Sequence, residues 1–94
     1  MIIYLSGPIS SCLDTYKQTF AEAQARFEAL GHIVISPAVL PLGLANESYL
    51  PICLKMLDAA DAIAMIGDWE KSAGAKMEKA YAEYQGKLVI YDTK

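Results

Sequence analysis

Short apolar runs alternate along the chain with longer stretches in which apolar residues recur every three or four positions. The runs at residues 2–6 and 62–66 are followed by Gly, and the run at 87–91 is preceded by Gly, as expected of strands joined to tight turns. A further run at residues 32–36 is rich in β-branched side chains. The pattern therefore predicts four strands.

Residues 14–30 show the clearest helical pattern. Asp14 or Thr15 is placed to cap the start of this helix, and Gly31 is placed to end it. The apolar residues that recur at helical spacing are Tyr16, Phe20, Ala23, Phe27 and Leu30.

Two further helices are predicted after an irregular loop at residues 37–45. Asn46 or Ser48 can cap the first of them, which has Pro51 in its first turn, where proline is tolerated. Its predicted inner stripe consists of Leu50, Cys53, Leu54 and Leu57. The last helix covers residues 72–85.

Strands that alternate with helices through short connections favour a parallel sheet, because right-handed crossovers are nearly the only compact way to wind such units. The predicted fold class is therefore α/β, with a single domain over residues 1–94 and a parallel sheet of four to five strands. Ligands of such sheets bind beyond the carboxyl ends of the strands. Residues 6–11, 36–38 and 67–74 are expected to meet there.

Composition limits the classes of function. With 94 residues, 54% of them hydrophobic, the chain is too apolar to be disordered and too short for a second core. A domain of this size leaves apolar surface uncovered, which favours a homodimer or a higher homo-oligomer. The net charge of -3 and the lack of a basic run argue against binding to a nucleic acid polymer or to a membrane.

The two cysteines, Cys12 and Cys53, lie far apart in apolar surroundings, as is typical of reduced thiols in a cytoplasmic protein. No metal-ligand spacing is present, so neither a metal nor another cofactor is expected. Residues 1–5 lack the charged leader of a signal peptide, and no apolar run approaches the ~18 residues of a membrane span. We therefore expect a cytoplasmic location.

Glu78 is the first candidate for chemistry. It lies in the first turns of the last predicted helix, and Ser72 and Gly74 stand at the start of that helix. A helix start carries unpaired amide N–H groups and a partial positive charge, so it can hold an anion. A carboxylate beside that anion can act as a nucleophile in glycosyl chemistry. The alternative is that Glu78 belongs to a solvated helix face.

The end of the first strand carries a second group of candidates. Tyr4 can donate a hydrogen bond to a carboxylate, and Gly7 allows the backbone to approach a ligand closely. Ser6, Pro8 and Ile9 belong to the same strand end and loop. The alternative is an ordinary strand and turn with Tyr4 packed in the core.

The loop after the third strand supplies two more candidates. Asp68 can hold sugar hydroxyls, and Trp69 can stack on a base, with simple packing as the alternative for the tryptophan. Asp61, at the entry of the same strand, is suited either to sugar hydroxyls or to capping the end of the preceding helix.

Residues 4–9 and 62–78 together resemble the nucleoside 2-deoxyribosyltransferase superfamily, in particular its short phage and bacterial branch. The resemblance extends over nearly the whole chain. It implies a three-layer sandwich of the flavodoxin or Rossmann kind. It also implies oligomers in which a neighbouring subunit completes the pocket.

The resemblance also implies roles for single residues. Glu78 would attack the anomeric carbon and release the base, Tyr4 would contact Glu78, and residues 6–9 would surround the nucleoside. Ser72 matches the phosphate-binding serine of the branch that hydrolyses deoxynucleoside 5′-monophosphates. Cys53 stands where family members often carry an Asp, so Asp58 or Asp61 would have to substitute, or that function is absent.

The leading hypothesis is hydrolysis or transfer of the N-glycosidic bond of a (deoxy)nucleoside 5′-monophosphate through a carboxylate nucleophile. The alternative is a catalytically inactive nucleotide-binding protein, for example a phage product that sequesters a nucleotide signal. Cys53 is the feature that separates these two hypotheses. A third possibility is a small assembly subunit without a ligand.

Overall fold

The computed structural model describes residues 1–92, apart from the side chain of Asn46. Strands and helices follow one another in the predicted order. Two short 3₁₀ turns interrupt the loops, at Pro37–Val39 and Trp69–Lys71. The strands are β1 (Ile2–Ser6), β2 (Ile33–Ile35), β3 (Ala62–Ile66) and β4 (Leu88–Asp92), and the helices are α1 (Tyr16–Ala29), α2 (Asn46–Asp58) and α3 (Ala73–Tyr84).

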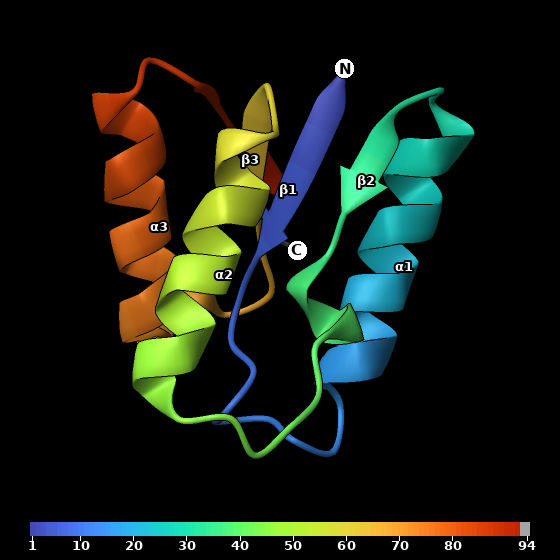
Figure 1. Cartoon of the computed structure of the whole chain (residues 1–94). Coiled ribbons are helices and arrows are strands. Elements are labelled where there is room, and N and C mark those ends of the chain that lie inside the picture. The colour runs from blue at the N-terminus through green and yellow to red at the C-terminus, as the bar shows by residue number, and fades with distance from the viewer. Residues whose placement is uncertain (93–94) are drawn as a thin grey trace.

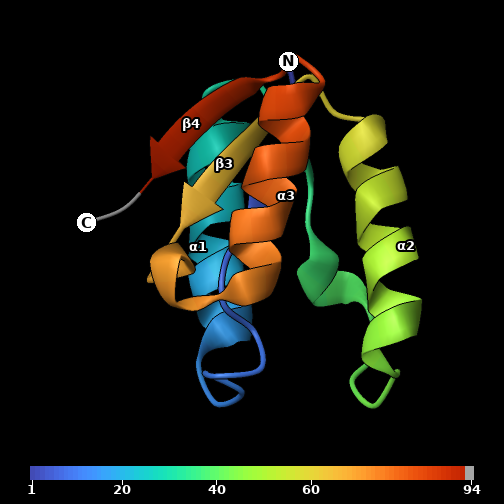
Figure 2. The same cartoon turned by 90° about the vertical axis from the view of Figure 1, so that its left-hand side faces the viewer.

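The four strands form one parallel sheet in the order β2-β1-β3-β4. In the register of the two central strands, Tyr4 of β1 lies beside Ile63 of β3. Figures 1 and 2 show α1 on one face of the sheet and α2 and α3 on the other. The predicted α/β class, parallel sheet and three-layer arrangement are therefore confirmed.

The side chains of β1 alternate between two cores, because successive residues of a strand point to opposite faces. Ile3 and Leu5 face α1 and belong to the cluster that includes Phe20. Tyr4 faces the other way and belongs to the cluster formed with α2 and α3. Ser6 lies two residues beyond Tyr4 and shares its face, so both polar side chains of β1 point into the layer of α2 and α3.

The ends of the helices match the predictions only in part. Leu30 follows the last residue of α1 and is 72% exposed, because Gly31, with a φ of 90°, turns the chain away from the helix. Thr15 is the N-cap of α1, but its side chain makes no capping hydrogen bond. α2 begins at Asn46, so its N-cap is Ala45, and the prediction that Asn46 or Ser48 caps it is wrong.

The inner stripe of α2 is shorter than predicted. Cys53 and Leu57 are buried and Leu54 is half-buried, but Leu50 is 38% exposed. Leu50 belongs to the first turns of α2, and Figure 1 shows these turns beyond the carboxyl ends of the strands. Within residues 1–92, no helix has both the length and the apolar character that crossing a bilayer requires.

Candidate active site

The carboxylate of Glu78 lies between α3 and the face of β1. Its residue is only 9% exposed. The hydroxyl of Tyr4 donates a hydrogen bond to Oε2 over 3.0 Å, and the hydroxyl of Ser6 donates one to Oε1 over 2.6 Å. Each carboxylate oxygen therefore has its own hydroxyl donor. The contact between Tyr4 and Glu78 that the resemblance implied is present.

Small residues of α3 bring Glu78 to the sheet. Ala75 and Ala82 lie three residues before and four residues after Glu78, and both are buried. This spacing places the three side chains on one face of the helix. The two alanines let α3 approach the sheet closely, so the longer side chain between them reaches β1. Gly74, at the start of the same helix, is exposed.

Cys53 of α2 completes the surroundings of the carboxylate. Its thiol interacts with both Tyr4 and Glu78, and its residue is 9% exposed. Burial raises the pKa of the Cys53 thiol, so the thiol stays neutral. A neutral thiol therefore faces the carboxylate from the helix on which the resemblance implied a second carboxylate.

The charge of Glu78 is stabilised by neutral groups. Burial raises the pKa of its carboxyl group, and the hydrogen bonds from Ser6 and Tyr4, together with the nearby Cys53 thiol, oppose that rise. Burial and the nearby charge of Glu78 raise the pKa of the Tyr4 hydroxyl, which keeps it protonated and able to donate. Among the ion pairs of the described residues, none includes Glu78. The carboxylate is thus held by neutral hydroxyl groups and not by an ion pair.

Ser72 is the N-cap of α3. Its hydroxyl oxygen accepts a hydrogen bond from the Ala75 amide over 3.1 Å, and the hydroxyl hydrogen remains a donor. The first backbone hydrogen bond of the helix runs from Lys76 to Ser72, so the amides of Ala73 and Gly74 precede it and have no partner within the helix. Three donors therefore stand together at the start of α3.

The loop after β1 packs toward α1. A Cβ atom on Gly7 would lie 2.8 Å from the carbonyl oxygen of Ile66, so Gly7 is required by its close contact with the end of β3. Pro8 is buried, and Ile9 packs against the cluster beneath α1. These contacts give the three residues packing roles on the face opposite Glu78, and substrate binding by this loop stays a prediction.

The loop after β3 does not place its polar side chains beside Glu78. Asp68 pairs with Lys71 over 3.9 Å and lines a cavity of about 180 Å³ on the α1 side, next to Arg26. Trp69 packs against Tyr91, with ring centres 5.8 Å apart, and the ammonium group of Lys79 lies 5.8 Å from the indole ring. These contacts favour the packing alternative for the tryptophan.

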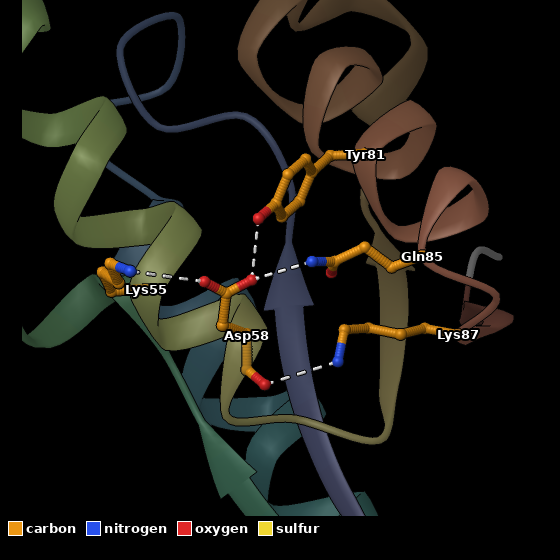
Figure 3. Close-up of polar contacts among 5 residues, drawn as sticks. All are labelled: Lys55, Asp58, Tyr81, Gln85 and Lys87. Atoms are coloured by element: carbon orange, nitrogen blue, oxygen red, sulfur yellow. Dashed lines mark hydrogen bonds and ion pairs between the residues drawn. The ribbon is translucent and has the colours of Figure 1, made fainter.

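Neither Asp58 nor Asp61 can take the place of the absent helical carboxylate. Asp58 lies at the end of α2, where its side chain accepts hydrogen bonds from Tyr81 and Gln85 (Figure 3). Asp61 accepts a hydrogen bond from the amide of Ile2 over 2.8 Å, which ties the starts of β1 and β3 together and does not cap α2. Both carboxylates therefore lie at the amino ends of the strands, away from the carboxyl ends.

One feature of the site was only partly found in the sequence. Ser6 was assigned to the substrate loop, although it bonds directly to Glu78. Its spacing of two residues from Tyr4 was the available signal. Within residues 1–92, no group of three His, Cys, Asp or Glu side chains is arranged to hold a metal ion.

The fold is that of the 2-deoxyribosyltransferases. The chain is similar to a 2-deoxyribosyltransferase from Bacillus psychrosaccharolyticus, with a TM-score of 0.79 and 23% identity over 99% of this chain and 72% of that one. It is similar to a 2-deoxyribosyltransferase from Leishmania mexicana, with a TM-score of 0.77 and 19% identity over 98% and 63% of the two chains. A conserved protein from Enterococcus faecalis V583 matches with a TM-score of 0.70 and 19% identity over 97% and 62%.

The chain spans less than two thirds of the last two of these proteins. No curated protein matches its sequence. The family model described as a domain of unknown function, DUF4406, matches residues 1–91. The chain belongs to this family.

Proposed function

We propose that the protein cleaves or transfers the N-glycosidic bond of a (deoxy)nucleoside 5′-monophosphate, with Glu78 as the nucleophile. The observation that carries this proposal is the buried carboxylate of Glu78, held by the hydroxyls of Tyr4 and Ser6 and matched by no cation among the described residues. The similarity of the fold to two 2-deoxyribosyltransferases supports the same chemistry.

The reaction has two steps. A carboxylate oxygen of Glu78 attacks the anomeric carbon, the bond from that carbon to the base breaks, and the base leaves with the bonding electrons and takes up a proton. Water or a second base then attacks the anomeric carbon and loses a proton, and the carboxylate is released. The hydroxyls of Tyr4 and Ser6 hold the carboxylate in place during both steps.

The start of α3 is the proposed phosphate site. Glu78 lies six residues after Ser72, which is about 9 Å along the helix axis. Helical side chains lean toward the amino end of their helix, so the carboxylate approaches the amides of Ala73 and Gly74. An anion bound there would place the sugar of the same molecule over Glu78, which favours a nucleotide over a free nucleoside.

The test is to incubate the protein with matched panels of nucleosides and 5′-monophosphates and to measure free base by chromatography. The expected result is release of base from at least one monophosphate and none with Glu78→Gln, which keeps the shape of the side chain without its nucleophilicity. Release of base by Glu78→Gln at the rate of the unaltered protein would exclude Glu78 as the nucleophile.

A binding protein without turnover is the second candidate, and Cys53 is the observation that favours it. The thiol faces Glu78 from α2, where the resemblance implied a carboxylate that assists the sugar or the leaving base. Calorimetric binding of a monophosphate without any release of base would support this alternative. Restoration of base release by Cys53→Asp would then identify the missing group.

A further inference from the structure

Glu78 is closed off in this structure. Its residue is 9% exposed, and the side chains of Tyr4, Ser6 and Cys53 surround the carboxylate. Tyr4 and Ser6 belong to the central strand β1, which is paired on both sides. Cys53 belongs to α2, which packs on the same face of the sheet as α3. These side chains leave little access to the carboxylate, and α2 carries the one of them that does not belong to the sheet.

α2 is held firmly at its carboxyl end. Asp58 accepts hydrogen bonds from Tyr81 over 2.8 Å and from Gln85 over 3.1 Å, and Lys87 donates to the backbone carbonyl of Asp58 over 3.4 Å (Figure 3). Lys87 also donates to the carbonyl of Ala60 over 2.6 Å. The hydrogen bonds from Tyr81 and Gln85 lower the pKa of the Asp58 carboxyl group, which keeps it ionised. Three side chains, from α3, its C-cap and the residue before β4, thus anchor the corner at residues 58–60.

The amino half of α2 has no comparable anchor. Of the described side chains in residues 47–52, none is buried. The hydroxyl of Tyr49 donates a hydrogen bond to the carbonyl of Pro41, within the loop that leads into the helix. This loop contains Gly43 with a φ of 95° and is exposed from residue 41 to residue 45. The loop and the first turns of α2 are therefore free to move together.

There is room for α2 to move into. A shallow, open groove of about 570 Å³ lies along the flank of α2 that faces the edge strand β2, away from α3. Its lining residues are Ile35, Pro51, Ile52, Lys55, Met56 and Ala59. A helix that rotates into this groove would keep its apolar side chains covered by Ile35 while it carries Cys53 away from Glu78.

We propose that α2 is a lid that opens by rotation about residues 58–60 into the groove beside β2, and that this opening exposes Glu78 to substrate. The role in substrate entry rests on the proposed function. The motion of α2 does not rest on the proposed function, because it follows from the uneven anchoring of α2 and from the groove beside it.

The thiol of Cys53 provides the test, because it becomes accessible only when α2 moves. In a Cys12→Ser background, the rate of Cys53 labelling by an aromatic disulfide reagent is measured at urea concentrations below the unfolding transition. Local opening exposes little surface, so we expect a labelling rate that depends only weakly on urea. A rate with the full urea dependence of global unfolding would overturn the lid.

Two pairs of variants locate the pivot and the groove. Tyr81→Phe removes one bond to Asp58 and should speed labelling several-fold, whereas Tyr84→Phe on the same helix, where Tyr84 is 91% exposed, should not change it. Ile52→Trp fills the groove and should slow labelling several-fold, whereas Leu30→Trp, just after the end of α1, should not. Unfolding midpoints show whether each variant is folded.

The outcomes separate the lid from the proposed function. Labelling is measured without nucleotide, so the lid can be supported even if no base is ever released. If labelling is insensitive to both Tyr81→Phe and Ile52→Trp in folded protein, the pivot and the groove are wrong, whatever the result of the base-release assay.

Discussion

Ser6 and Glu78 are 72 residues apart in sequence, yet their side chains form a 2.6 Å hydrogen bond in the buried layer between β1 and α3. The bond depends on two regular spacings. Ser6 shares a strand face with Tyr4 because it lies two residues away, and Glu78 reaches that face because Ala75 and Ala82 keep α3 close to the sheet. The backbone geometry of one strand and one helix therefore sets the orientation of the carboxylate.

Ser6→Ala should move the acid limb of the pH profile to higher pH. The hydrogen bond from Ser6 lowers the pKa of the Glu78 carboxyl group, whereas burial raises it. Without that hydrogen bond, the pKa of Glu78 should therefore rise. The proposed nucleophile acts only when ionised, so activity falls as pH falls through that pKa. A charge-assisted hydrogen bond is worth ~1.5–3 kcal/mol, which corresponds to at least about a tenfold loss of kcat/KM on the acid side.

The measurement is kcat/KM for base release as a function of pH, with Ser11→Ala as the matched control. Ser11 is exposed in the same loop region. An unshifted acid limb in Ser6→Ala would show that Ser6 does not tune the carboxylate.

Glu78→Gln should be more stable than the unaltered protein at neutral pH. Burial raises the pKa of Glu78 in the folded state above its ordinary value, which the unfolded state keeps. At a pH between these two pKa values, the folded state therefore binds more protons than the unfolded state. Stability therefore falls as pH rises through this window, and the neutral amide avoids that loss. The lowered pKa of Asp58 acts in the opposite direction but equally in both proteins, so it cancels in the comparison.

Urea unfolding at acid and neutral pH measures this difference. We expect the two proteins to differ least at acid pH, where Glu78 is protonated. Equal stability of the two proteins at neutral pH would mean that the carboxylate is not penalised by burial.

The regular part of the fold could be predicted from the sequence, because strands and helices leave periodic patterns. All four strands and three helices were predicted, and the strand boundaries differ by at most one residue. The exposure of Leu30 and Leu50 could not be predicted from periodicity. It depends on where each helix extends past its neighbours, which the pattern of one helix does not contain.

The site was predictable to a smaller extent. The resemblance implied the contact of Tyr4 with Glu78, and strand periodicity contained a signal for Ser6. The orientation of residues 7–9 toward α1 could not be predicted, because it follows from the fit of Gly7 against Ile66. A loop of Gly, Pro and Ile is compatible with either face of the sheet until that contact is known.

Gly7→Ala should destabilise the protein. The new Cβ atom would lie 2.8 Å from the carbonyl oxygen of Ile66, and neither backbone can move without disturbing a central strand. Overpacking of this kind costs ~1–3 kcal/mol. Gly74→Ala is the matched control, since its Cβ would meet only Ser72 Oγ, at 3.9 Å, and alanine favours a helix by up to ~1 kcal/mol over glycine. Urea unfolding of both variants measures the two changes in the free energy of unfolding. An unchanged free energy of unfolding in Gly7→Ala would contradict the prediction.

The protein should be at least a dimer at micromolar concentration. Several large apolar side chains on β2 and on the loop before α2 are exposed, and a domain of this size covers only part of its apolar surface. These side chains are Ile33, Val39, Leu42 and Leu44. Light scattering measures the mass directly, and a stable 10.2 kDa monomer would contradict the prediction.

A 5′-monophosphate should bind more tightly than its nucleoside, and Ser72 should account for part of the difference. The Ser72 hydroxyl can donate to a phosphate while its oxygen caps α3, and a hydrogen bond to a charged group is worth ~1.5–3 kcal/mol. Ser72→Gly is the suitable variant, because glycine at an N-cap costs only a few tenths of a kcal/mol, whereas alanine costs ~1 kcal/mol and would weaken the helix itself.

Calorimetry with matched nucleoside and monophosphate pairs measures the effect. In Ser72→Gly, we expect the advantage of the monophosphate to shrink by about tenfold while the affinity for the nucleoside stays nearly unchanged. The residual advantage would come from the amides of Ala73 and Gly74, which the substitution leaves in place. Equal affinities of the unaltered protein for nucleoside and monophosphate would exclude the start of α3 as a phosphate site, and with it the proposed preference for nucleotides.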